Sequence, residues 1–236
     1  MAEAEHYDDA IALLREGIYW VPADKNVFSL YQSCAELLGR EGKTEEAIKL
    51  LRGGIAKVPA EFGRHKLIEG ALYLSAAARR QNWLEDLLIG QIGTALSAAQ
   101  KALGRSLLQQ LTGDWEGAAT EASSGISTLL TYLPLYVQEA FCRLCARQPD
   151  RAQAALDRLP HALEHRKGAP YTWLACFIAL RRNDVDAVRQ LYASSSTVRR
   201  NWPPCRPRRI SFAFGTVPWL FRRRIRLTTT QRSLLP

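Results

Sequence analysis

A seventeen-residue segment near the N-terminus recurs 37 residues later almost position for position, and this repeat constrains the fold more than any other feature of the chain. Residues 8–24 read DDAIALLREGIYWVPAD, and residues 45–61 read EEAIKLLRGGIAKVPAE. Weaker copies occupy 113–126, 148–160 and 182–192, and a degenerate copy lies at 81–90. A period of about 20–50 residues is typical of stacked repeats, in which each unit buries a face of its neighbour.

Each copy follows an apolar segment with helical spacing, so the predicted unit is a helix, a short turn and a second helix. First helices are expected at 26–40, 65–80, 93–111, 134–147 and 169–182. Second helices are expected at 7–20 and in the copies above, with a small residue where helices cross: Ala10, Ala47, Ala118, Ala152 and Ala187, with Asp86 in the degenerate copy. Leu and Ala dominate the composition, which also favours an all-α chain.

The sequence Gly42-Lys43-Thr44 raises the question of a phosphate-binding loop. Such a loop needs a glycine five residues before the Gly-Lys pair, where this chain has Leu37, and it must follow a strand rather than a helix. The segment therefore predicts a turn between two helices. Helix N-caps are expected at Thr44, Asp114, Asp150 and Asp184.

The pattern resembles the tetratricopeptide repeat family, whose unit is a pair of helices of about 34 residues. The likeness is strong over 8–61, fair over 113–192 and weak over 62–92. The resemblance implies a right-handed α-solenoid of about five tetratricopeptide-like helix pairs. We expect one helical repeat domain over 1–194, followed over 195–236 by a basic tail that is disordered or not native in origin.

Members of this family carry a large residue one turn before a small one in the first helix. Three segments of the chain match: Tyr31 with Ala35, Tyr136 with Ala140, and Tyr171 with Ala175. A proline ends the unit in the family, as Pro22 and Pro59 would do here. The chain opens with a second-type helix that lacks its own first helix, which predicts either a cap or an arm of a larger protein.

The first helices of the family line a concave groove, so the resemblance implies a non-catalytic scaffold for protein–protein interaction. The groove positions carried over are Gln32, Glu36, Arg40, Ala71, Ser75, Arg79, Leu103, Leu107, Gln110, Val137, Phe141, Leu144, Thr172, Cys176 and Ala179. This groove is expected to be polar at its N-terminal end and apolar toward its C-terminal end. Such a surface suits a partner peptide or amphipathic helix, or else a further segment of the same protein.

One group of residues has the types that bind zinc. Cys142, Cys145, His161 and His165 form C-x2-C-x15-H-x3-H, which is near the spacing of a Cys2His2 site. The two cysteines fall on a predicted first helix, however, and the intervening segment has the second-helix pattern. We therefore expect two thiols in the helical core or groove and two surface histidines, and we treat a zinc-dependent module as a lesser alternative.

No catalytic set is visible among the four histidines and the acidic residues, so we expect neither an enzyme nor a cofactor. The five cysteines, the absence of a signal segment and the lack of a membrane-spanning apolar run predict a cytoplasmic protein with reduced thiols.

The net charge of +9 is concentrated in the tail, because 199–236 holds ten arginines and no acidic residue. Nucleic-acid or anionic-membrane binding through this tail is the alternative function.

Overall fold

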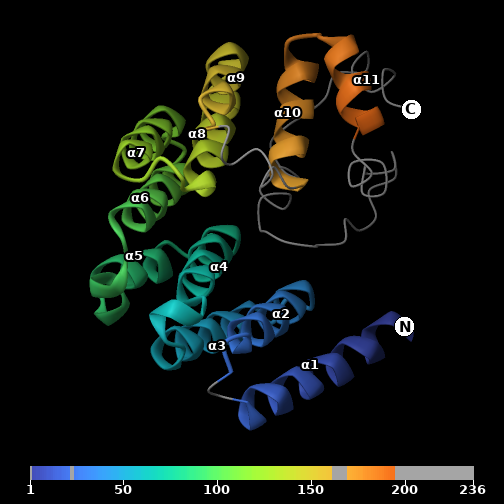
Figure 1. Cartoon of the computed structure of the whole chain (residues 1–236), viewed down its shortest axis with the longest axis vertical. Coiled ribbons are helices and arrows are strands. Elements are labelled where there is room, and N and C mark those ends of the chain that lie inside the picture. The colour runs from blue at the N-terminus through green and yellow to red at the C-terminus, as the bar shows by residue number, and fades with distance from the viewer. Residues whose placement is uncertain (1, 22–23, 161–168, 195–236) are drawn as a thin grey trace. The chain divides into compact units, whose positions relative to one another are not determined.

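The computed structural model describes residues 2–21, 24–160 and 169–194, and these residues form eleven α-helices, two short 3-10 segments and no strand (Figure 1). The expectation of an all-α chain is confirmed for this part of the molecule. The chain divides into two compact units, 1–96 and 97–236. The single repeat domain over 1–194 stays a prediction, and the tail over 195–236 lies outside the described residues.

The first unit contains five helices that pack in chain order. They are α1 (Ala2–Trp20), α2 (Val27–Arg40), α3 (Thr44–Lys57), α4 (Arg64–Ala77) and α5 (Gln81–Ile89), with 3-10 segments at Ala60–Phe62 and Gln91–Ala95. Helix α2 contacts α1, α3 and α4, while α3 and α5 each contact α4. Within this unit α1 therefore forms one edge, with α2 beside it (Figure 1).

The second unit contains six helices arranged by the same rule. They are α6 (Ala98–Thr112), α7 (Trp115–Thr128), α8 (Leu133–Cys145), α9 (Pro149–Asp157), α10 (Ala169–Arg181) and α11 (Val185–Ser194). Successive helices pack on each other, and the first-type helices α6, α8 and α10 also contact one another in order. This is the packing of a helical repeat, in which each helix pair lies on the next.

One backbone turn recurs in all five described hairpins. Five residues adopt positive φ after a first-type helix: Gly42 (82°), Arg79 (57°), Gly113 (89°), Arg147 (64°) and Asn183 (58°). The next residue then donates its N–H to a carbonyl five positions earlier, as Lys43 does to Leu38 at 2.9 Å. This is the Schellman termination of a helix, which favours glycine because a left-handed residue has no Cβ penalty there. Gly42 is therefore the predicted turn residue.

The position of this turn shows which residue of each second-type helix is buried at the crossing. The residue five positions beyond the left-handed residue is buried in every hairpin: Ala47, Leu84, Ala118, Ala152 and Val188. The expected crossing position Asp86 was therefore wrong, whereas Ala187 is half-buried and packs against the cluster of Ala179, Leu180 and Val188. Asp86 is exposed and pairs with Arg52, while Leu84 and Val188 occupy the buried positions.

The predicted helix bounds hold to within three residues in most places, with two larger differences. Helix α1 begins at Ala2 rather than at residue 7. Helix α6 begins at Ala98 rather than at residue 93, because Ser97 and Gln100 form a reciprocal capping box. A 3-10 segment, Gln91–Ala95, occupies the preceding residues.

The expected N-caps are confirmed at two of four positions. Asp114 accepts the N–H of Gly117 at 2.9 Å, and Asp184 accepts the N–H of Ala187 at 3.0 Å. The caps at Thr44 and Asp150 were wrong, because both residues lie inside the first turn, after Lys43 and Gln148. In α9, Pro149 takes the first helical position, so the cap lies at Gln148, two residues before Asp150.

Candidate partner-binding surfaces

The predicted groove begins on α2 with three polar side chains. Glu36 and Arg40 form an ion pair at 2.7 Å, and Gln32 is half-buried beside them on the same helix face. Burial raises the pKa of Glu36, while the Arg40 guanidinium acts in the opposite direction. These residues form a partly accessible polar surface on the first unit.

The predicted groove positions on α4 lie in different environments. Ser75 is fully buried and donates its hydroxyl to the carbonyl of Ala71, itself buried, at 2.8 Å. Arg79 lies beyond the end of α4, in the left-handed turn, and is exposed. Neither Ser75 nor Ala71 offers its side chain to a partner in this conformation.

The groove positions of the second unit lie almost entirely in its interior. Leu103, Leu107, Gln110, Val137, Phe141, Leu144, Cys176 and Ala179 are all buried, and Thr172 is half-buried. The Phe141 ring meets Trp115 of α7 edge-on, with centroids 6.1 Å apart. Because α6, α7 and α8 pack closely, these apolar side chains stabilise the unit, and peptide binding at them stays a prediction.

A buried polar network joins three helices of this unit. The Nε2 of Gln138 on α8 lies 2.9 Å from Oε1 of Gln110 and 3.2 Å from Oγ of Ser106, both on α6. Ser106 donates to the carbonyl of Ala118 on α7 at 2.7 Å, and Sγ of Cys142 lies 3.3 Å from Gln138. Buried polar groups satisfied in this way fix helix register, so we assign the network to the fold.

The two cysteines of the candidate zinc site differ in exposure. Cys142 is fully buried, and burial raises the pKa of its thiol, whereas a zinc ligand must be a thiolate. Cys145 is half-buried on the same helix. The other two residues, His161 and His165, lie outside the described part of the chain, within which no cluster of His, Cys, Asp or Glu could hold a metal ion.

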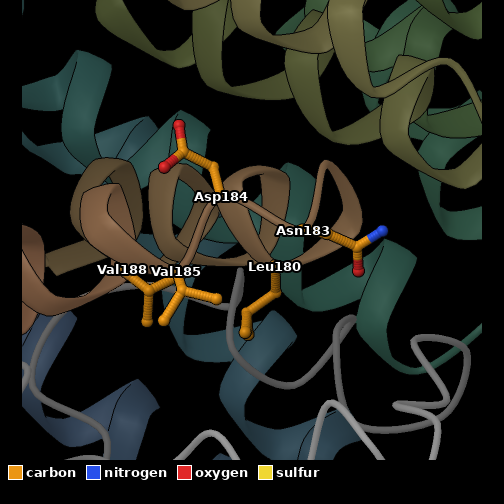
Figure 2. A pocket seen from close by; sticks show the side chains of 5 residues that line it. All are labelled: Leu180, Asn183, Asp184, Val185 and Val188. Atoms are coloured by element: carbon orange, nitrogen blue, oxygen red, sulfur yellow. The ribbon is translucent and has the colours of Figure 1, made fainter.

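A small pocket lies at the turn between α10 and α11. Leu180, Asn183, Asp184, Val185 and Val188 line it, and Figure 2 shows the Asp184 carboxylate directed away from the three aliphatic side chains. Its volume is about 10 Å³, whereas ligand pockets measure about 300–1,000 Å³. The Asp184 carboxylate is already engaged as the N-cap of α11. The pocket therefore does not suit a small-molecule ligand.

Several exposed apolar side chains of the first unit share one face of α1. Its residues recur at helical spacing along one face, since neighbours three or four apart share a face. We call this face the α1 stripe, which consists of Ala10, Leu13, Gly17, Trp20 and Val21. The exposed fraction is 70% for Leu13, 69% for Trp20 and 42% for Val21. Nearby, the Trp20 indole donates to Glu16 at 3.4 Å.

The matching face of α3 is enclosed at three of its five positions. The residues 37 positions later are Ala47, Leu50, Gly54, Lys57 and Val58. Ala47, Gly54 and Val58 are buried there, and Val58 is only 1% exposed. Leu50 is half-buried, and Lys57 is exposed like its counterpart Trp20. The same sequence pattern therefore has a covered face in one copy and an uncovered face in the other.

The two glycines show which side of α1 is uncovered. A methyl group on Gly54 would lie 3.0 Å from Leu67 of α4 and 2.9 Å from the Tyr31 ring of α2. A methyl group on Gly17 would lie 3.3 Å from Leu30 of α2, which is the residue equivalent to Leu67. No side chain of the described residues occupies the place equivalent to Tyr31.

The sequence pattern contained a signal for this surface. Among the described residues, no first-type helix packs on the side of α1 that faces away from α2, so one face of α1 is left uncovered there. The carried-over groove positions did not include any residue of α1. Among the other exposed apolar side chains, Tyr19 lies on α1 with its ring edge-on to Trp20, while Ile89, Leu129 and Leu130 lie at helix ends or in a turn.

Comparison with protein-family models, curated proteins and solved structures finds no match for this chain. The likeness to tetratricopeptide repeats therefore depends on the residues and packing described above. Among the described helices, none is both long and apolar enough to cross a membrane.

Proposed function

We propose that this chain is a non-catalytic scaffold of tetratricopeptide-like helix pairs that binds a partner polypeptide. Two regularities support the repeat architecture. The left-handed turn recurs at intervals of 37, 34, 34 and 36 residues, and first-type helices contact the next first-type helix within each unit. A helical repeat of this kind presents extended surfaces that suit protein recognition.

The observation that carries the proposal is the exposed α1 stripe. Leu13 and Trp20 are each about two-thirds exposed or more, although large apolar side chains gain roughly 1.5–3 kcal/mol each when fully buried. Exposed large apolar side chains that share one helix face mark an interaction site more often than scattered single residues do. We therefore place partner binding on α1 ahead of the predicted groove.

The test uses two displayed peptide libraries, one of amphipathic helices and one of extended hydrophobic peptides, selected against the full chain. Selected clones are expected to bind. Leu13→Glu should weaken that binding about tenfold or more, because the bound peptide would remove the new carboxylate from water without giving it a partner. The matched control is Ile89→Glu, which alters an equally apolar side chain that is 84% exposed on α5.

Both substituted side chains are largely exposed, so neither change removes a core contact. Failure to recover a binder from either library would contradict the proposal. Equal effects of Leu13→Glu and Ile89→Glu would contradict the assignment of the site to α1.

A further inference from the structure

We infer, resting on the proposed function, that the α1 stripe accepts one amphipathic helix from a separate polypeptide, in the place that α2 takes on α3. The docked helix carries an aromatic residue one turn before a small residue and has basic flanks. It completes a helix pair with α1, so binding extends the repeat by one first-type helix.

The template for this docking is present in the same unit. On α3 the Tyr31 ring of α2 covers Gly54, and the small residue Ala35 follows one turn later in the same buried face. Because α1 repeats the residues of α3, a helix with the same aromatic and small residues fits against Gly17. The opposite side of Gly17 is already occupied by Leu30, as the opposite side of Gly54 is by Leu67.

The charge of α1 indicates which charged residues the partner helix carries beside its apolar face. Residues 2–20 contain five acidic residues and one arginine. Asp9 and Glu16 lie four residues before and three residues after Leu13, so both border the stripe on the helix surface. Lys43 is already paired with Asp8, at 2.9 Å. A partner with Lys or Arg beside its apolar face therefore has complementary charge.

A second copy of this chain is a poorer occupant. In the described residues each first-type helix already packs in its own hairpin, and Tyr31 and Tyr136 are buried there. Pairing two α1 helices would bring two acidic surfaces together, which opposes association. The structure thus favours a helix supplied by a different protein.

The first experiment completes the missing pair covalently. A copy of residues 26–43 is placed directly before Tyr7 of the full chain, in the register that joins α2 to α3. We expect the melting temperature to rise by about 2–4 °C and hydrogen exchange of the α1 amides to slow about tenfold. The matched control carries Tyr31→Asp in the copied helix alone and should show neither effect. Unchanged exchange in the graft, or equal protection by the control, would overturn the inference.

The second experiment uses a free labelled peptide with the sequence of residues 26–40. A second version carries Ser29→Lys and Ser33→Lys, since both serines are exposed on α2. We expect the lysine version to bind about three- to tenfold more tightly at low salt, and the difference to shrink at high salt. Binding by neither peptide, or binding unaffected by Leu13→Glu in the protein, would overturn the inference.

The outcomes separate the inference from the proposed function. If the libraries yield only extended peptides that depend on Leu13, and the graft leaves α1 unprotected, the proposed function holds and the helical partner is wrong. Sedimentation that detects dimers abolished by Leu13→Glu would assign the stripe to a second copy and overturn the choice of a separate protein.

Discussion

Helices α1 and α3 carry nearly the same residues in the same order, yet their neighbours differ. Helix α3 lies between α2 and α4, whereas among the described helices α1 packs mainly on α2. Val58 at the end of α3 is 1% exposed, and the equivalent Val21 is 42% exposed. Burial in a repeat is therefore a property of the neighbouring helix as much as of the sequence.

The equivalent apolar faces of the two helices also differ in what they contact. On α3 the stripe contributes to the free energy of folding, because α2 and α4 remove it from water. On α1 the equivalent face keeps Leu13, Trp20 and Val21 exposed to solvent. Paired substitutions at equivalent positions test this directly, because each pair changes the same residue type in the two surroundings.

The largest effect is expected from truncating the central leucine of each helix. Leu51 is buried and lies against Gly70 of α4, so Leu51→Ala should cost about 3 kcal/mol of unfolding free energy. Leu14 is only half-buried, and Leu14→Ala should cost about 1 kcal/mol. Urea unfolding of the full chain measures both. Equal losses would show that α1 is enclosed as fully as α3.

The two glycines should differ in the sign or size of their response to alanine. Gly54→Ala forces a methyl group to within 2.9 Å of the Tyr31 ring and should cost about 1–3 kcal/mol. Gly17→Ala meets only Leu30, at 3.3 Å, and gains helix propensity worth up to about 1 kcal/mol. We expect the second change to be close to neutral in a thermal melt. A loss at Gly17 as large as that at Gly54 would contradict an open side on α1.

The turn before α3 offers a smaller test, because α1 has no hairpin turn of its own among the described residues. Gly42→Ala should cost about 1 kcal/mol, since φ is 82° there. The equivalent residue of the next hairpin is Arg79, at φ 57°, and Arg79→Gly should stabilise the chain by about 0.5 kcal/mol. Thermal denaturation of the two variants checks both signs. Destabilisation by Arg79→Gly would show that the two turns are not equivalent.

The helix pairs could be predicted because apolar spacing, turn residues and helix caps are local features of the sequence. Apolar spacing and turn residues placed most helix ends within three residues, and Asp114 and Asp184 cap helices as their positions suggested. The start of α6 was missed although Ser97 and Gln100 have capping-box spacing, because the apolar residues before them extended the helical pattern. The register of the degenerate copy was missed because residues 81–90 lack the alanine that aligns the other copies, and Asp86 was assigned to its place.

The candidate site could not be predicted in the same way, because exposure depends on which helices are neighbours. Leu107 and Phe141 matched groove positions by pattern, but close packing within the second unit buries them. Leu13 has the same residue type as its counterpart Leu50 and yet is left exposed. Residue type and spacing predict a face, and only the arrangement of helices decides whether that face is covered.

The smallest expected effect concerns the interface between α1 and α2. Burial raises the pKa of the Cys34 thiol on α2, while Arg15 on α1 lowers it by charge and hydrogen bonding. The unfolded thiol loses its proton near pH 8.5, so the stability associated with a raised pKa is complete below that pH and declines as pH rises. Arg15→Ala raises the folded-state pKa further, and the decline should then continue to higher pH.

The matched control is Arg52→Ala on α3, where the residue equivalent to Cys34 is Ala71 and no thiol is present. Each variant loses one ion pair, to Glu46 or to Asp86, and Arg52→Ala also loses the contact with the Trp83 carbonyl at 3.4 Å. None of these interactions changes in strength between pH 8 and pH 10. The free energy of unfolding, measured by urea titration at the two pH values, should fall more for Arg15→Ala than for Arg52→Ala. The difference between the two declines is expected to be less than about 1 kcal/mol. Parallel declines would mean that Arg15 does not act on Cys34.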